Sequence, residues 1–468
     1  MTKRLSIFLI AFSSIVLAAC GGCKPNTPPD DPTPQTVDSS EVAGQPDMSL
    51  VKSSIPVTDD WIFSGKPSIT FHIENANKAK VRVGAKMKIV TDDWQDVITV
   101  TDTLEVAGNS TQDFVLTTPD NLAPGFYRAT CAINGKGVRS QFVFGIDPFR
   151  IVSAPDKQAD FDEFWNTAKQ QLAGIDMNVN MIELTAKSTD KRKVYLVEMQ
   201  SVPDGLTGDP VTIRGYYYEP QDGQPHPVIM HYFAYDEQNA KGKLDCPSGG
   251  YTDEFAEFYL SHRGQYINNR KESQREPDGL GDLTNIYGDW FAYHFGDKNS
   301  YYYRGAYLDC VQAVNFMATR PTSDMQHLFA EGSSQGGALC YAAAALSDYP
   351  FTAITPNVAF MGDFPDYFRI VSWPAETAKA KQGNMTDAEM YAFLSYFDTK
   401  NLATRISAAV LATSGLQDGV CPPHTNIAPF NNLLTAPADK EYHFYPEMQH
   451  AYPTGWNGMI LKFFRKYL

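Results

Sequence analysis

The chain has 468 residues, which is long for a single domain, so we expect two folded units preceded by a leader. Its hydrophobic fraction of 43% is that of a globular protein able to bury sizeable cores. The net charge of -15 argues against nucleic acid as a partner, because nucleic-acid binders need a basic surface. No stretch after the leader is long and apolar enough to cross a bilayer.

Residues 1–20 have the features of a bacterial lipoprotein signal peptide. Two basic residues precede an apolar core at residues 5–17, and residues 17–20 (Leu-Ala-Ala-Cys) resemble a lipobox. In such signals the cysteine is lipidated and becomes the mature N-terminus, so we predict a lipid anchor at Cys20 as the contact with a membrane. The residue after Cys20 is Gly21 and not Asp, which favours sorting to the outer membrane of a Gram-negative host. The protein could face the periplasm or the cell surface. An ordinary signal peptide with a coincidental cysteine is the alternative.

Residues 21–47 are rich in Pro, Asp, Thr and Ser, which predicts a disordered tether. The five cysteines beyond it show no paired spacing and no Cys-x-x-Cys pattern. Export permits disulfides, but the number is odd and the folded regions are large enough without them. We therefore predict no zinc site and no other cofactor. These cysteines are Cys131, Cys246, Cys310, Cys340 and Cys421.

Residues 48–149 alternate short β runs with turn residues. Several short strands at this spacing predict an all-β, immunoglobulin-like sandwich. We find no catalytic constellation here, so a spacer or substrate-guiding module is the preferred interpretation and a glycan binder the alternative. The runs are at residues 68–73, 80–83, 96–100, 114–116, 125–130 and 141–144.

Residues 150–468 show a different pattern, in which apolar strands alternate with helices. Apolar side chains recur at helical spacing over residues 161–172 and 459–464. Alternation of this kind predicts an α/β fold with a mostly parallel sheet and helices on both faces. The buried-strand candidates are residues 227–230, 327–330, 408–412 and 442–445.

The most informative motif is the Gly-x-Ser-x-Gly of residues 332–336. It lies between the strand candidate at 327–330 and an alanine-rich helical run at 338–346. This order is typical of a nucleophile elbow, in which a strained turn exposes the serine hydroxyl. Glycines two positions away on either side let the neighbouring backbone approach. We therefore predict that Ser334 is a nucleophile for acyl transfer.

A serine nucleophile needs a base to remove its proton. His450 comes after the strand candidate at 442–445, in the loop before the last helix, and is the predicted base. His443 lies inside that strand and is expected to be packed. His424, in a proline-rich loop, is the second choice.

The base in turn needs a carboxylate that orients it. Asp418 follows the strand candidate at 408–412 and is the predicted acid, with Asp363 as its rival. The order Ser334, Asp418, His450 is that of α/β-hydrolases and differs from the chymotrypsin and subtilisin orders. The oxyanion needs two backbone N–H donors, and we predict those of Gln335 and Phe233.

Further sequence elements are more specific than an elbow alone. They are Arg263-Gly264-Gln265, the run from Tyr303 to Asp309, Gly332 to Gly337, Gly415 to Asp418 with Cys421-Pro422-Pro423, and His450. With these elements the chain from about Asp156 to its end resembles the acetyl xylan esterase and cephalosporin C deacetylase family, carbohydrate esterase family seven. The resemblance covers the C-terminal two-thirds of the chain. We interpret Arg263 as a structural residue in a buried ion pair.

The resemblance implies an α/β-hydrolase that removes acetyl groups from acetylated sugars such as xylan or xylo-oligosaccharides. It also implies the catalytic triad Ser334, Asp418 and His450 and a reaction that needs no cofactor. A homo-oligomer is one possible assembly that it implies. The chain departs from the family at Tyr232 and Phe233, where Gly and Tyr are usual.

Further departures are Tyr266 after Arg-Gly-Gln, Ala451 after His450, and residues 269–299. All these positions surround the acyl pocket, so they bear on the substrate and not on the triad.

Two other functions fit parts of the pattern. A serine peptidase of the prolyl-oligopeptidase type also carries an N-terminal β domain, but residues 48–149 are too few for a propeller. A non-catalytic, glycan-binding surface lipoprotein is the other alternative. It is disfavoured because all three triad positions are filled.

Overall fold

The computed structural model describes residues 46–55, 61–133, 139–204, 208–235, 251–265, 267 and 287–468, all within one compact unit. The predicted signal with Cys20, most of the tether, Cys246, Tyr266 and much of the 269–299 segment lie outside the described residues. Within the described ranges, no helix is both long and apolar enough for a membrane span.

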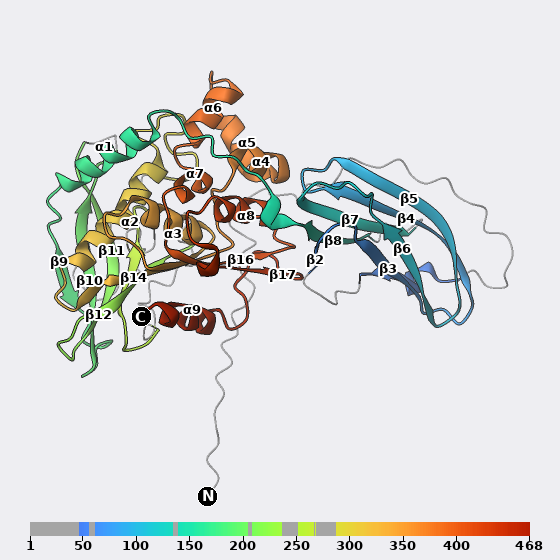
Figure 1. Ribbon diagram of the computed structural model, residues 1–468, viewed down its shortest axis with the longest axis horizontal. Coiled ribbons are helices and arrows are strands. Elements are labelled where there is room, and N and C mark those ends of the chain that lie inside the picture. The colour runs from blue at the N-terminus through green and yellow to red at the C-terminus, as the bar shows by residue number, and fades with distance from the viewer. Residues whose placement is uncertain are drawn as a thin grey trace, which may run out of the picture. The chain divides into compact units, whose positions relative to one another are not determined.

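Residues 51–146 form two sheets, which Figure 1 shows in blue and teal. Neighbouring strands are antiparallel except for β2 and β8. Buried and outward side chains alternate along most of β4, as the sequence pattern predicted. One sheet has the order β1 (Val51–Ser54), β3 (Ser68–Asn75), β6 (Ser110–Thr117); the other has the order β2 (Ile62–Phe63), β8 (Arg139–Ile146), β7 (Gly125–Ile133), β4 (Val81–Thr91), β5 (Asp96–Val106).

The rest of the chain contributes a 9-stranded sheet with the order β17-β16-β15-β14-β12-β13-β11-β10-β9. From β17 to β13 the neighbours are parallel, and from β13 to β9 they are antiparallel, so the sheet is mostly parallel as predicted. The strands are β9 (Asn180–Glu183), β10 (Arg192–Ser201), β11 (Val211–Pro220), β12 (His226–Tyr232), β13 (Ala256–Ser261), β14 (Ser323–Ser333), β15 (Ala353–Asn357), β16 (Ala409–Gly415) and β17 (Lys440–Tyr445).

Helices cover both faces of this sheet, because successive strand side chains point to opposite sides. Ile229 and Phe329 pack with Trp456 and Ile460 of the C-terminal helix, α9, on one face. Their neighbours on the other face belong to the core that includes α2 and α3, which Figure 1 shows away from α9. The helices are α1 (Phe161–Ala173), α2 (Tyr302–Ala318), α3 (Gln335–Leu346), α4 (Phe364–Ile370), α5 (Ser372–Lys381), α6 (Asp387–Leu394), α7 (Thr399–Ala403), α8 (Pro423–Asn431) and α9 (Trp456–Phe464).

The strands near the predicted acids end at positions that the sequence did not define. β15 ends at Asn357, and the next residue, Val358, has a φ of 39°, which no strand residue adopts. β16 continues to Gly415, beyond the predicted end at residue 412. Asp418 therefore follows its strand by a single tight turn, in which its N–H donates to Gly415 O at 3.2 Å.

Candidate active site

The predicted elbow joins β14 to α3, with Ser334 between them. Ser334 has φ 59° and ψ -119°, a strained conformation that non-glycine residues rarely adopt. A Cβ at position 332 would overlap Gly336 O, and a Cβ at position 336 would overlap Tyr232 O. Glycine is therefore needed at both positions, and the turn lies directly against the end of β12.

Asp418 and His450 meet where the loops after β16 and β17 come together. The Nδ1 of His450 and the Oδ2 of Asp418 are 2.8 Å apart and hydrogen-bonded. The other oxygen of Asp418 accepts hydrogen bonds from the backbone N–H groups of Val420 and Cys421, both at 2.8 Å. Because Asp418 binds Nδ1, Nε2 is the ring nitrogen of His450 that remains for the predicted role as a base.

Asn357 connects this pair to the elbow, a role that the sequence did not indicate. The Ser334 N–H donates to Asn357 O at 2.9 Å. The Asn357 side-chain amide donates to Ala451 O at 3.2 Å and to Ser333 Oγ at 2.8 Å. Thr413 of β16 donates to the remaining amide oxygen, so the fully buried Asn357 links three strand ends.

The Ser334 hydroxyl forms no hydrogen bond with His450 among the described residues; it lies near the Cys421 thiol. Burial raises the pKa of Cys421 well above its usual value, although the hydroxyls of Tyr367 and Ser334 partly oppose the shift. Cys421 is thus a neutral thiol and not a competing nucleophile. Catalytic hydrogen bonds are often long in the free enzyme and tighten only in the substrate complex.

The second choices for acid and base occupy other positions. Asp363 accepts a hydrogen bond from the Lys400 ammonium group at 2.8 Å. His424 is the second residue of α8 and is not in a loop, and its Nδ1 lies 3.0 Å from Asp92 Oδ2. His443 is partly exposed beside Glu441 at 2.9 Å, so the expectation that it is packed was wrong.

The predicted oxyanion donors come from α3 and from the loop after β12. Gln335 is the first residue of α3, and first-turn N–H groups have no partner within their own helix. Phe233 directly follows β12, whose last residue, Tyr232, pairs in register with Gly332. The two predicted donors thus follow the neighbouring strands β14 and β12, Gln335 at the start of α3 and Phe233 directly after β12.

The side chain of Gln335 is held by a buried network that sequence reasoning missed. Its amide nitrogen lies 2.7 Å from His262 Nε2, and its oxygen accepts from Tyr303 at 2.9 Å. Burial lowers the pKa of His262 to about 4, so the ring is neutral and accepts at Nε2. Its Nδ1 proton then points to the Tyr302 oxygen at 2.8 Å. This network fixes the side chain of the residue that follows Ser334.

The motifs around Arg263 and Tyr303–Asp309 are parts of one buried ion pair. The Arg263 guanidinium binds Asp309 through Nη2 at 2.6 Å and Nε at 2.9 Å, and both side chains are almost completely buried. A Cβ at Gly305, one helical turn before Asp309, would overlap the guanidinium. The predicted buried ion pair of Arg263 is confirmed.

A second buried charge cluster crosses the strands β13, β12 and β14. His231 lies between Glu257 at 2.9 Å and Glu331 at 2.7 Å, and it stacks on Tyr259 with centroids 3.9 Å apart. Burial by itself lowers the pKa of His231, but hydrogen bonds to the two glutamates outweigh it and raise the pKa to about 9. The cluster joins the strands that carry Phe233 and Ser334.

This cluster predicts a loss of stability at alkaline pH. The pKa of His231 is about 9 in the folded protein and 6.5 otherwise, so its contribution is complete below pH 6.5 and is lost as the pH rises through about 9. The contribution is on the order of 3 kcal/mol. Thermal unfolding between pH 6 and pH 10 measures it.

The matched variants are His231→Gln and His443→Gln. His231→Gln should be less stable at pH 7, because two buried glutamates lose their partner, and its Tm should depend less on pH between 6.5 and 9. His443→Gln should keep the wild-type pH dependence. A wild-type pH dependence in His231→Gln would contradict the assignment.

Comparison with known proteins agrees with this geometry. The acetyl xylan esterase (AXE1) family model matches residues 150–467. The acetyl esterase Axe7A of Xylanibacter ruminicola is 26% identical over 332 residues, which are 68% of this chain and 69% of that protein.

Two solved structures are also similar. The acetyl xylan esterase from Paenibacillus sp. R4 is 27% identical, with a TM-score of 0.56 over 67% of this chain and 96% of that chain. Acetyl xylan esterase 1 from Thermoanaerobacterium sp. JW/SL YS485, at 23% identity and a TM-score of 0.55, covers 67% of this chain and 95% of its own and shows the same α/β-hydrolase-like fold. The chain belongs to the acetyl xylan esterase family and is a carboxylic ester hydrolase.

Proposed function

We propose that the protein removes acetyl groups from acetylated sugars through an acetyl-enzyme on Ser334. The observation that carries the proposal is the hydrogen bond between His450 and Asp418 beside a strained serine elbow. Membership of the acetyl xylan esterase family supports the acetyl group as the acyl portion. Xylan or xylo-oligosaccharides are the proposed substrates, since similar proteins are named for xylan.

The mechanism has two steps of acyl transfer. His450 Nε2 takes the proton of Ser334, whose oxygen attacks the acetyl carbonyl carbon. The N–H groups of Gln335 and Phe233 bind the oxyanion, and Asp418 stabilises the imidazolium. The proton then passes from His450 to the sugar oxygen, and the carbon–oxygen bond breaks. Water, deprotonated by His450, attacks the acetyl-enzyme and releases acetate.

Acetate release from four acetylated substrates tests this proposal. We expect release from acetylated xylan and xylo-oligosaccharides, and less from acetylated mannan and pectin. Cleavage of dipeptide amides without hydrolysis of acetyl esters would indicate a peptidase. Tight glycan binding without acetate release would indicate a binding protein.

We further propose that residues 48–149 are an immunoglobulin-like spacer and that Cys20 anchors the exported protein to the outer membrane. In support of the first, the Tyr127 hydroxyl donates to Ala123 O at 2.7 Å, similar to the tyrosine corner of such sandwiches. The lipobox-like residues 17–20 support the second. A lipidated N-terminal peptide in the mass spectrum would test the anchor, and an unmodified cysteine would contradict it.

A further inference from the structure

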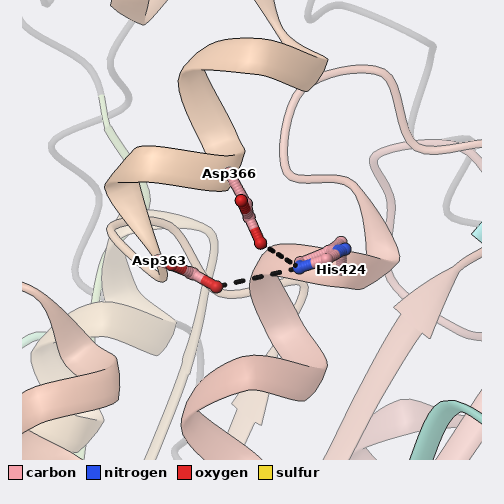
Figure 2. A group of neighbouring side chains, drawn as sticks. All are labelled: Asp363, Asp366 and His424. Atoms are coloured by element: carbon pink, nitrogen blue, oxygen red, sulfur yellow. Dashed lines mark ion pairs between the residues drawn. The ribbon is translucent and has the colours of Figure 1, made fainter. Parts of the chain in front are cut away.

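One cluster away from the triad combines side chains that bind metals: Asp363, Asp366 and His424. Figure 2 shows both carboxylates directed towards one ring nitrogen of His424. The Oδ2 atoms of Asp366 and Asp363 lie 2.9 Å and 3.7 Å from His424 Nε2, respectively. All three ligand atoms lie within 4.8 Å of one another. Asp363 and Asp366 come from the start of α4, and His424 from the start of α8.

Asp363 Oδ2 and His424 Nε2 are buried, and neither takes part in a well-aligned hydrogen bond. The two atoms are 3.7 Å apart, which is too long for such a bond, and Nε2 has Asp366 Oδ2 at 2.9 Å as its nearest acidic neighbour. Asp363 is only 3% exposed, and Lys400 binds its other oxygen. A buried carboxylate oxygen without a well-aligned donor is costly unless a cation compensates it. An ion between the facing oxygen and nitrogen would compensate both atoms.

The charge around the cluster also favours a cation. Ion pairs in and around it join five carboxylates to His424 and to two bases, each of which is shared between two carboxylates. Arg128 adds a positive charge near Asp92, and Asp398 adds a carboxyl group near Asp363 and Lys400, so acidic groups outnumber bases. The five carboxylates are Asp92, Asp93, Asp156, Asp363 and Asp366, and the two shared bases are Arg369 and Lys400.

The far side of the imidazole is oriented as in many metal sites. His424 Nδ1 lies 3.0 Å from Asp92 Oδ2, in the turn between β4 and β5. A carboxylate on one ring nitrogen fixes the tautomer that presents the other nitrogen to a metal. A cavity of about 190 Å³, lined by Asp92, Asp366, Arg369 and His424 among others, adjoins the cluster. It provides a path for the ion and room for water.

We propose that Asp363, Asp366 and His424 bind one divalent first-row transition metal ion, with Zn²⁺ as the best fit. Zinc takes imidazole and carboxylate ligands at about 2.0–2.2 Å, which places neighbouring ligands of a tetrahedron roughly 3.3–3.5 Å apart. The distances of 2.9 Å and 3.7 Å bracket that value. An imidazole ligand disfavours Mg²⁺ and Ca²⁺, which prefer oxygen alone. Water from the cavity completes the coordination.

The ion holds the starts of α4 and α8 together and, through Asp92, the β4–β5 turn. Without the ion, the imidazolium form of His424 is stabilised by the same three carboxylates. Metal binding must displace the Nε2 proton and is therefore coupled to proton release. The site was not evident from the sequence, because His424 is far in the chain from both aspartates and no Cys-x-x-Cys pattern marks it.

Titration of the chelator-treated protein with Zn²⁺ tests the proposal. We expect saturable binding of one ion per chain. Binding should release about one proton, a number obtained by comparing the binding heats in buffers of different ionisation enthalpy. Co²⁺ in the same site should give visible absorption bands that Zn²⁺ removes. Asp92→Asn should weaken binding by about 10–100-fold, since Asp92 only orients the ligand.

His424→Gln should abolish binding, and Asp366→Asn should weaken it at least as much as Asp92→Asn. Asp366 is partly exposed, so that variant remains informative if His424→Gln does not fold. His443→Gln is the matched control, because His443 also lies beside a carboxylate, and should bind Zn²⁺ as the wild type does. Absence of saturable Zn²⁺ binding to the wild type, or equally tight binding by Asp366→Asn, would overturn the proposal. The protonated ring of His424, and not a metal ion, would then compensate the carboxylates.

Discussion

Replacing Ser334 with alanine should lower kcat for p-nitrophenyl acetate by a factor on the order of 10⁵, because no acetyl-enzyme can form. The remaining rate would come from the oxyanion donors and from His450 acting on water. Serine and alanine both have a Cβ atom, so the backbone strain at the φ of 59° is about the same in the wild type and the variant. The variant should therefore keep the fold. Steady-state kinetics with a thermal unfolding curve separates lost chemistry from lost structure.

Ser347→Ala is the control for this experiment. Ser347 caps the opposite end of α3, where its hydroxyl accepts a hydrogen bond from the Tyr349 N–H at 3.0 Å. Its replacement should leave kcat within a factor of about 2, since surface caps affect stability by about 1 kcal/mol and not chemistry. Near wild-type hydrolysis by Ser334→Ala would exclude Ser334 as the nucleophile.

The largest loss of stability is expected for Asp309→Asn. Removing one partner of a buried ion pair leaves the other charge uncompensated, at a cost of about 3–5 kcal/mol. Arg263 would keep its bond to Val202 O at 3.1 Å but would face a neutral amide, with one oxygen and one NH2 group, in place of the carboxylate that neutralises it. Urea unfolding of wild type and variant measures the difference in the free energy of unfolding.

An exposed ion pair provides the comparison. Lys80 and Glu105 are 3.1 Å apart, with 67% and 61% of their side chains exposed. Glu105→Gln should change the free energy of unfolding by less than about 1 kcal/mol, because solvent screens such pairs. If Asp309→Asn costs no more than Glu105→Gln, the buried pair does not stabilise the fold as argued here.

The features that the sequence predicted are those with a local signal. The elbow could be found because strand, glycine spacing and helix follow one another within about twenty residues of Ser334. Asp418 and His450 could be placed because each comes shortly after a recognisable apolar strand. Their pairing did not follow from spacing alone; it was inferred from chain order and appears in the structure at 2.8 Å.

The features that the sequence did not predict depend on distant partners. His262 acquires its position from Gln335, and His231 from Glu257 and Glu331, all of which lie on other segments of the chain. Such side chains have no distinctive spacing, and a histidine within an apolar run resembles any packed residue. Asn357 is similarly hidden, since its side-chain partners lie on β14, on β16 and in the loop after β17.

The most direct test of the central claim is labelling with a fluorophosphonate, which reacts with activated serines. We expect one label per chain, found on the peptide that contains Ser334, with acetyl esterase activity lost in proportion to labelling. Asp418→Asn should be labelled far more slowly, because His450 loses its orienting carboxylate. Full inactivation with the label on another residue, or full labelling of Ser334 with acetate release unchanged, would contradict it.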